Sequence, residues 1–428
     1  MNSFIRSLTV LAVIAVACGV RAETVAVDAN ANRHPIDPRV YGTAFAPDSA
    51  TLTDLNCPVH RHGGNTTSTY NWLQNAANHA QDWYYESLDE GSPTAGASAD
   101  SFVQIGKGAG ADSLITIPML GYVAKLGPSR GKLASFSIAK YGAQTGNDSQ
   151  WYPDAGNGIS SSTGKQIVGN DPTDANVAAD STFQKAWVQH LVGKWGASTA
   201  GGVRYFILDN EHSIWQSTHV DVHPNGPTMD EIKTKMIDYA TMIKSVDANA
   251  LCVGPEEYGW TGYLYNGADQ VAGAANGWTS FPDRAAHGNM DYMPYLLQQM
   301  NANNVATGKR LLDVFSLHCY PQGGEFSNTV TAAMKTLRNK STRQLWDPTY
   351  VDQSWINDKV MLIPRMKKWV STYYPGTQIA ITEYNWGAES DINGATAQAD
   401  IFGIFGREGL DMATRWTTPA SNTRRTMR

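Results

Sequence analysis

Eight short apolar segments recur along the chain, and helix-like segments lie between most of them. Several of the eight are nearly continuous apolar runs, as expected for parallel strands that are buried on both faces. The segments are residues 41–46, 58–62, 114–120, 205–210, 251–255, 312–320, 378–384 and 412–416. Strands and helices that alternate in this way predict an α/β fold, a (β/α)8 TIM-like barrel, in which functional side chains gather at the C-terminal ends of the strands.

The segments between the strands carry helical signals of two kinds. Apolar residues fall on one helical face over residues 183–195, 232–243 and 363–373. Thr228 and Glu231 have the spacing of a capping box ahead of the second of these segments. By contrast, residues 121–180 are rich in Gly, Asn, Asp and Ser, and we expect a long loop there, functional or disordered, that rises from the third strand.

The N-terminus has the pattern of a secretory signal peptide. Arg6 precedes an apolar run over residues 8–17, and small residues follow it up to Ala22. The run is about half of the ~20 residues that a membrane helix needs, so an anchor is the weaker interpretation. We therefore predict a secreted protein, extracellular or periplasmic, that is cleaved near Ala22.

Composition narrows the classes of function. The net charge of −6 and the lack of a dense basic stripe argue against a nucleic-acid partner, and no other segment is apolar and long enough for a membrane partner. The 13 Trp and 19 Tyr suit sugar binding, although most such rings belong in the core. After signal removal Cys57, Cys252 and Cys319 remain, and this odd number predicts buried free thiols.

Two glutamates stand near the ends of predicted strands. Glu211 follows the fourth strand and Glu383 lies near the end of the seventh. A lone glutamate is more often a solvent-facing or salt-bridged residue, but strands four and seven lie on different sides of a barrel pocket. Cleavage of a glycosidic bond needs such a pair, one acid for the leaving oxygen and one carboxylate opposite the anomeric carbon. The pair predicts a glycoside hydrolase.

Residues around these glutamates fit the same chemistry. Asn210 precedes Glu211 and is placed to bind a sugar 2-hydroxyl group. His318 and Tyr320 alternate on strand six, so both should face the carboxylate from strand seven, although a lone His is more often a core residue. Tyr320 and Arg61 on strand two can hold Glu383 ionised by hydrogen bonding and by charge. We predict that Arg61, Asn210, His318 and Tyr320 belong to the substrate-binding site.

Further substrate contacts are expected from aromatic and acidic residues beyond the strand ends. Trp386 and Trp416 follow strands seven and eight and are predicted sugar platforms. Glu257 follows strand five directly after Glu256, and either a substrate contact or an ion pair would suit these two residues. We predict a substrate contact for Glu257.

Six sequence blocks resemble glycoside hydrolase family 44. They are VYGTAFA at 40–46, RHGGNTTSTYN at 61–71, WYPDAGNG at 151–158, LDNEHSIWQSTHVDVHP at 208–224, GPEEYGW at 254–260 and ITEYNWG at 381–387. The resemblance implies an endo-β-1,4-glucanase that acts on cellulose derivatives and often on xyloglucan, with retention of configuration. It assigns Glu211 as the acid/base and Glu383 as the nucleophile. Retention requires the two carboxyl groups to lie roughly 5–5.5 Å apart.

The chain also departs from the family pattern. His212 stands where the family pattern leads us to expect Pro, and His62 where it leads us to expect Trp. Some relatives bind calcium, and Asp154, Asp171 and Asp174 offer oxygen ligands for a structural calcium ion, although a solvated polar loop is the simpler interpretation. No cofactor is expected for catalysis, and no metal ligand is assigned.

The resemblance implies a domain division. Residues 1–22 would be the signal peptide, 23–40 a strand segment that joins the β-sandwich of the family, 41–416 the catalytic barrel and 417–428 a polar tail. Most of the sandwich would be absent, as in a truncated chain. The predicted partner is a β-glucan polysaccharide, and the predicted state is a monomer. The alternatives are a retaining xylanase or other barrel glycosidase, a non-catalytic carbohydrate-binding protein, and an unstable truncated fragment.

Overall fold

The computed structural model describes residues 28, 30, 31 and 33–420. The chain divides into two compact units, Met1–Pro35 and Ile36–Arg428. The predicted signal peptide lies outside the described residues, and in the first unit the Asn30 backbone N–H donates to the Asp28 carboxylate. The barrel and the candidate site belong to the second unit. In the described part of the chain, no helix combines the length and the apolar character needed to cross a membrane.

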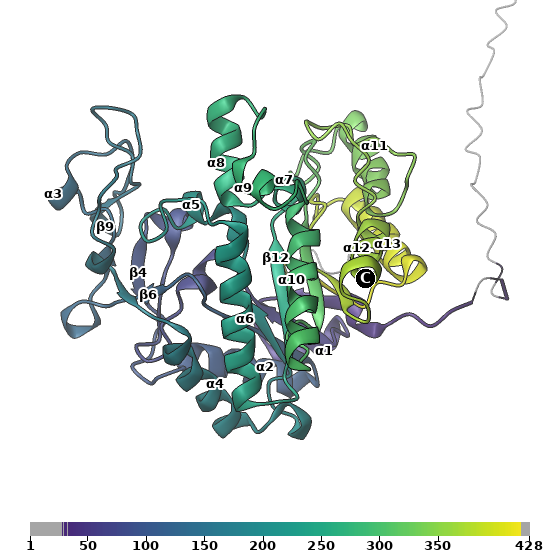
Figure 1. Ribbon diagram of the computed structural model, residues 1–428, viewed down its shortest axis with the longest axis horizontal. Coiled ribbons are helices and arrows are strands. Elements are labelled where there is room, and N and C mark those ends of the chain that lie inside the picture. Colours follow the sequence, from purple (N-terminus) through teal and green to yellow (C-terminus); the bar gives the residue numbers. More distant parts are fainter. Residues whose placement is uncertain (1–27, 29, 32, 421–428) are drawn as a thin grey trace, which may run out of the picture. The chain divides into compact units, whose positions relative to one another are not determined.

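Eight parallel strands close into a barrel in the second unit, as predicted (Figure 1). They are hydrogen-bonded in the order β1-β15-β14-β13-β12-β11-β5-β2. Their bounds are β1 Gly42–Ala44, β2 Val59–His62, β5 Asp112–Ile117, β11 Tyr205–Leu208, β12 Leu251–Glu257, β13 Val314–Cys319, β14 Gln378–Tyr384 and β15 Met412–Arg415. All eight predicted strands are present, with ends that shift by a few residues.

Long helices cover the barrel between the strands (Figure 1). They are α2 Ala97–Ala109, α4 Ser181–Trp195, α6 Met229–Val246, α10 Tyr292–Thr307, α12 Leu362–Tyr373 and α13 Ile392–Glu408. Shorter helices are α1 Ser49–Asp54, α3 Ile138–Tyr141, α5 Trp215–Thr218, α7 Trp260–Leu264, α8 Gly267–Asn276, α9 Pro282–Ala286 and α11 Ala332–Ser341. The Thr228 side chain accepts from the Glu231 backbone N–H at 3.1 Å, so the predicted N-terminal cap of α6 is present.

The predicted loop over residues 121–180 was only partly right. The connection contains β6 Tyr122–Ala124, β7 Leu133–Ala134, β8 Asn147–Asp148, β9 Tyr152–Gly156 and β10 Asn176–Ala178. They form small antiparallel sheets. β10 pairs with β6, β8 pairs with β9, and β7 joins the hairpin of β3 Ala76–Asn78 and β4 Glu86–Asp89. Strands of two to five residues have too little apolar periodicity to be read from the sequence, because neighbours distant in sequence determine their pairing.

The core has two layers. Inside the barrel, apolar side chains from most of the strands pack together, including Val59, Leu114, Tyr205 and Val314. A second and larger cluster fills the space between the outer barrel face and the helices. Cys57, Cys252 and Cys319 are buried free thiols, as predicted. The interior is therefore filled, and the C-terminal ends of the strands are left as the place for polar chemistry.

Candidate active site

Glu211 and Glu383 reach the C-terminal end of the barrel from opposite sides. Glu383 lies within β14, whereas Glu211 lies three residues after the end of β11, which stops at Leu208 and not at the predicted residue 210. Asp209 and Glu211 have positive φ angles of 62° and 46°. Such a conformation is strained for residues other than glycine, and strain of this kind gathers at functional sites. A tight turn thus directs the Glu211 side chain.

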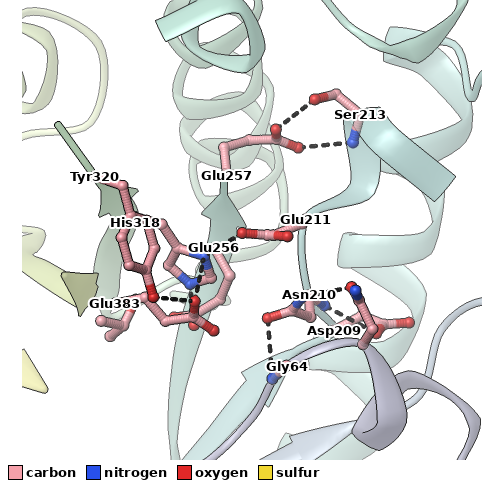
Figure 2. Close-up of polar contacts among 12 residues, drawn as sticks. Gly64, Asp209, Asn210, Glu211, Ser213, Glu256, Glu257, His318, Tyr320 and Glu383 are labelled. Atoms are coloured by element: carbon pink, nitrogen blue, oxygen red, sulfur yellow. Dashed lines mark hydrogen bonds and ion pairs between the residues drawn. The ribbon is translucent and has the colours of Figure 1, made fainter. Parts of the chain in front are cut away.

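The two carboxylates face each other across His318 of β13 (Figure 2). Nδ1 of His318 lies 2.7 Å from Oε1 of Glu211 and 3.7 Å from Oε2 of Glu383. One oxygen of each glutamate and one nitrogen of His318 all lie within 4.8 Å of one another. Three such groups could hold a metal ion, and in this structure His318 Nδ1 contacts Glu211 directly.

Arg61 joins the site from β2 and is fully buried. Its Nη1 donates to Glu383 Oε1 at 2.7 Å, and its Nε and Nη2 lie 3.0 and 2.7 Å from Glu256 Oε2. A Cβ at Gly63 would lie 2.2 Å from the Arg61 guanidinium carbon, so the glycine makes room for the side chain. The structure therefore gives Arg61 the contact with Glu383 that the sequence predicts, and adds Glu256 as a second partner.

Asn210 lies beside this arginine. Its Oδ1 accepts from Arg61 Nη2 at 2.9 Å and from the Gly64 backbone N–H at 3.2 Å. These bonds fix the amide so that its Nδ2 group points away from Arg61, 3.5 Å from the Asn65 side-chain oxygen. A contact between Asn210 and a sugar hydroxyl stays a prediction, and the amide N–H group is the donor available for it.

Charges decide the protonation state of His318. Burial alone would lower its pKa, but Glu383, Glu211 and Glu256 outweigh burial and raise the pKa of His318 to about 10. Its Nε2 lies 3.1 Å from Glu256 Oε2. Burial raises the pKa of Glu256, but Arg61 and His318 outweigh that effect and hold it at about 2. His318 is thus an imidazolium and Glu256 a carboxylate at neutral pH.

Glu211 and Glu383 differ in their surroundings. Burial raises the pKa of Glu211, and the nearby charge of Glu383 adds to this, while His318 opposes it. Glu383 instead accepts two hydrogen bonds, from Arg61 and from the Tyr320 hydroxyl at 3.0 Å. Glu211 is therefore biased toward carrying a proton, as a general acid requires, while Glu383 is held in place by two hydrogen-bond donors.

Glu257 does not occupy the predicted substrate position. It is fully buried at the end of β12, within the strand and not after it, and it faces Ser213 (Figure 2). The Ser213 backbone N–H donates to its Oε1 at 3.0 Å and the Ser213 hydroxyl to its Oε2 at 2.5 Å. Burial raises the pKa of Glu257 to about 8. Glu257 therefore supports the turn that carries Glu211.

We expect the stabilising contribution of the protonated Glu257 side chain to be lost as the pH rises. Its folded pKa of about 8 lies above its ordinary value, so the folded state binds this proton more tightly than the unfolded chain does. The contribution is fully present below about pH 4.5 and is lost as the pH rises to about 8. The melting temperature of Glu257→Gln, taken relative to that of the wild type, should therefore be higher at pH 8 than at pH 5. Parallel melting curves across this range would contradict the assignment.

The two predicted tryptophan platforms differ. Trp386 is only 2% exposed, and its indole N–H donates to the Ser341 hydroxyl at 3.0 Å, so it belongs to the core and the prediction of a platform was wrong. Trp416 is half-buried, and the Arg61 guanidinium carbon lies 5.9 Å from its ring centre. It stands beside the charged cluster, where contact with a sugar stays a prediction.

The two histidines that depart from the family pattern are buried. His212 lies in the turn after Glu211, its Nε2 lies 2.8 Å from the Leu208 carbonyl oxygen, and burial lowers its pKa to about 4. His62 packs against the rings of Phe45 and Phe102, and burial lowers its pKa to about 4 as well. Both are neutral at physiological pH and serve in packing.

The residues considered for calcium already have partners. Asp154 accepts from the Ser137 hydroxyl at 2.6 Å, Lys140 forms an ion pair with Asp174 at 2.6 Å, and Asp171 caps the turn at Thr173. The ammonium group of Lys140 stands where a cation would otherwise bind Asp174. These contacts favour the solvated polar loop, and calcium binding at this loop stays an untested prediction.

Sequence reasoning left one charged residue undecided and missed a group of rings. Glu256 pairs with Arg61 and His318, and only its position within β12, next to a shift in strand register, could have indicated this. The rings of Trp83, Tyr84 and Trp151 lie together outside the barrel, with Trp83 5.7 and 5.5 Å from the other two. Their signal in the sequence was the aromatic run at 83–85 in a polar setting.

A (β/α)8 barrel with two facing glutamates at its C-terminal end defines the class of barrel glycoside hydrolases. The profile of glycoside hydrolase family 44 matches residues 76–323, and the chain belongs to this family. It is 32% identical to endoglucanase A of Paenibacillus lautus and 31% identical to β-mannanase/endoglucanase A of Caldicellulosiruptor saccharolyticus. Each match covers 92% of the chain, which spans 55% and 30% of the length of these two relatives.

Solved structures agree with this membership. CelM2, a bifunctional glucanase-xylanase from a metagenome library, is 63% identical with a TM-score of 0.91, over 92% of this chain and 76% of that one. A family 44 xyloglucanase of Paenibacillus polymyxa is 29% identical with a TM-score of 0.72, over 92% and 75% of the two chains. The similarity therefore runs across the whole barrel.

Proposed function

We propose that this chain is a secreted endo-acting glycoside hydrolase that cleaves β-1,4-glucan with retention of configuration. The observation that carries the proposal is the placement of Glu211 and Glu383 across His318, with carboxylate oxygens within 4.8 Å. Its relatives include proteins described as endoglucanases, a xyloglucanase and a glucanase-xylanase. Secretion rests on the N-terminal pattern alone.

The proposed reaction runs in two displacements. Glu383 attacks the anomeric carbon while Glu211 gives its proton to the glycosidic oxygen, so the glycosidic bond breaks and a glycosyl ester of Glu383 forms. Glu211, now ionised, takes a proton from water, which attacks the same carbon and releases Glu383. The spacing supports retention, because an inverting pair stands about 6.5–9.5 Å apart to admit water between the sugar and the base.

The surrounding charges support these roles. Arg61 and Tyr320 hold the Glu383 carboxyl group in place through two hydrogen bonds, which orients it for attack. His318 touches Glu211 through Nδ1, and its positive charge can balance Glu211 after the proton has left. Arg61 contacts Glu256 and Glu383, and His318 contacts Glu211 and Glu256, so each of the three carboxyl groups has a basic partner.

A xylanase is the second candidate, because the relative that is 63% identical is described as a glucanase-xylanase. Both activities would use the same pair of glutamates, so they differ in how the cleft receives the sugar chain. A non-catalytic binding protein would have no use for a strained turn that holds one carboxyl opposite another.

We propose a monomer that acts on polysaccharide.

The proposal is tested by product stereochemistry. Purified protein is incubated with carboxymethyl-cellulose, xyloglucan and xylan, and a soluble cello-oligosaccharide is followed by proton NMR. We expect the β-anomer to appear first, before mutarotation, and the viscosity of the polymers to fall early, as in endo cleavage. Initial release of the α-anomer would contradict retention. Cleavage of xylan alone would replace the glucan assignment with the second candidate.

A further inference from the structure

Among the described residues, the fully buried side chain of Arg338 on α11 donates hydrogen bonds only to uncharged oxygen atoms. The acceptors, at 2.6–3.0 Å, are the backbone carbonyl groups of Glu325, Ser327, Thr329 and Trp386 and the side-chain oxygen of Asn393. Burial of a cation without a carboxylate partner is costly. A charge kept at such a cost draws attention to the chain segments that the guanidinium group joins.

One of these segments is residues 320–331, which connect β13 to α11. The segment begins with Tyr320, whose hydroxyl donates to Glu383 (Figure 2). The ring of Phe326 packs edge-on against the ring of Tyr320, with 5.5 Å between the ring centres. Arg338 binds the carbonyl groups on both sides of Phe326, so it fixes the ring that supports Tyr320.

The other segment follows β14, the strand that carries Glu383. Trp386 lies three residues beyond Glu383, and its carbonyl oxygen accepts from Nε of Arg338 at 2.9 Å. The next residue, Gly387, has a φ of 70°, and a Cβ there would clash with the Phe326 carbonyl oxygen. The two segments therefore touch, and Arg338 joins them to each other.

We propose that Arg338 is a positioning residue for the nucleophile of the proposed glycosidase reaction, on which this inference rests. Tyr320 and Glu383 come from the ends of neighbouring strands, and their hydrogen bond at 3.0 Å requires these ends to keep a fixed separation. Arg338 sets that separation, because one guanidinium group binds the segments that follow both strands. An error of about 1 Å in such an arrangement can cost on the order of a hundredfold in rate.

The test is a double-mutant cycle between Arg338 and Tyr320, measured as initial rates on cellohexaose well below the melting temperature. Arg338→Met removes the donors and should lower kcat about tenfold, while KM stays within about twofold. Arg338→Lys should recover little of the loss, because one ammonium group cannot serve both segments. In the Tyr320→Phe background, where the hydrogen bond to Glu383 is already absent, Arg338→Met should cost no more than about twofold.

An equal cost of Arg338→Met in both backgrounds would overturn the positioning role, because a merely structural residue costs the same with or without the Tyr320 hydroxyl. Where Arg338→Met does not fold, Phe326→Ala tests the same link, since Phe326 is 51% exposed. It should lower kcat about threefold in the wild type and leave it unchanged in Tyr320→Phe. A loss that persists in Tyr320→Phe would overturn the link. Val330→Ala, an exposed position in the same segment, is the control.

A spectroscopic measurement separates this inference from the proposed function. Tyrosine labelled with carbon-13 at Cζ gives a signal for Tyr320, which is identified by its loss in Tyr320→Phe. This signal should shift in Arg338→Met as the hydrogen bond to Glu383 weakens, and an unmoved signal would overturn the role of Arg338 whatever the activity. A wild type that cleaves no glucan would instead reject the proposed function.

Discussion

Replacing Glu383 with Ala should lower kcat on soluble glucan by about 10⁴-fold or more, because the group that forms the bond to the anomeric carbon is gone. The expected fall in activity comes without collapse of the fold, since Arg61, the ion-pair partner of Glu383, keeps its second partner Glu256. The comparison is made by initial rates on carboxymethyl-cellulose and xyloglucan. Unchanged rates would remove Glu383 from the reaction.

Glu383→Gln is the matched control for shape. The amide has the size of the carboxyl group and can still accept a hydrogen bond from Tyr320, but it lacks the charge and cannot act as a nucleophile. Activity should be lost as in Glu383→Ala. In addition, Glu383 is the strongest of the influences that raise the pKa of His318, so this pKa should fall from about 10. Nitrogen chemical shifts of His318 across pH 6–10 would measure the change.

The Glu383 variants also separate chemistry from binding. If Glu383 serves only the bond-forming step, Glu383→Gln should still bind cello-oligosaccharides with nearly the affinity of the wild type. A loss of binding equal to the loss of kcat would instead assign the residue to substrate contact. Small anions such as azide offer a further check, because the space left by Glu383→Ala can admit one as an external nucleophile, giving a glycosyl azide of inverted configuration.

The barrel was predictable because its strands are buried on both faces. Burial of both faces requires nearly continuous apolar runs, and such runs are visible in a single sequence, as at 205–208 and 378–381. The cap at Thr228 was also local, since its acceptor and donor are three residues apart. The short strands within residues 121–180 were not predictable, because the pairing of β6 with β10 joins segments about fifty residues apart.

The site was predictable only in part. Glu211 and Glu383 could be placed because both come at strand ends, where the fold itself brings side chains together. Trp386 also follows a strand end and was therefore predicted at the site, but its ring points inward to Ser341, which no local pattern indicates. The role of Glu256 depends on Arg61, which lies 195 residues away in sequence, so the sequence could not decide between substrate contact and ion pair.

Replacing Arg61 with Met should destabilise the fold by about 3–5 kcal/mol at pH 7, the usual cost of removing one partner from a buried ion pair. Arg61 and Glu256 are both fully buried, and Glu256 would be left ionised with only His318 as a cationic partner. Denaturant unfolding measures the loss. Arg284→Met is the matched control, because the Arg284–Asp291 pair at 2.6 Å is about 30% exposed, and its loss should cost no more than about 1 kcal/mol.

The pH dependence of this loss identifies its cause. In the wild type the pKa of Glu256 is lowered to about 2, so its contribution to stability is present above about pH 4.5 and is lost as the pH falls toward 2. Without Arg61, Glu256 can take up a proton at higher pH, and the difference between Arg61→Met and wild type should shrink from pH 7 to pH 4. A loss that stays constant over this range would point to packing.

The double variant Arg61→Met/Glu256→Gln tests whether the ionised Glu256 causes the loss of stability. If the cost of Arg61→Met comes from an uncompensated carboxylate, neutralising that carboxylate should restore much of the lost stability, although Glu383 also loses its Nη1 contact. Activity should not return, because the Arg61 contact with Glu383 is still missing. Stability that recovers without activity would separate the two tasks of one arginine, which are to neutralise Glu256 and to hold Glu383. If neither stability nor activity recovered, the whole effect of Arg61→Met would be assigned to the lost contact with Glu383.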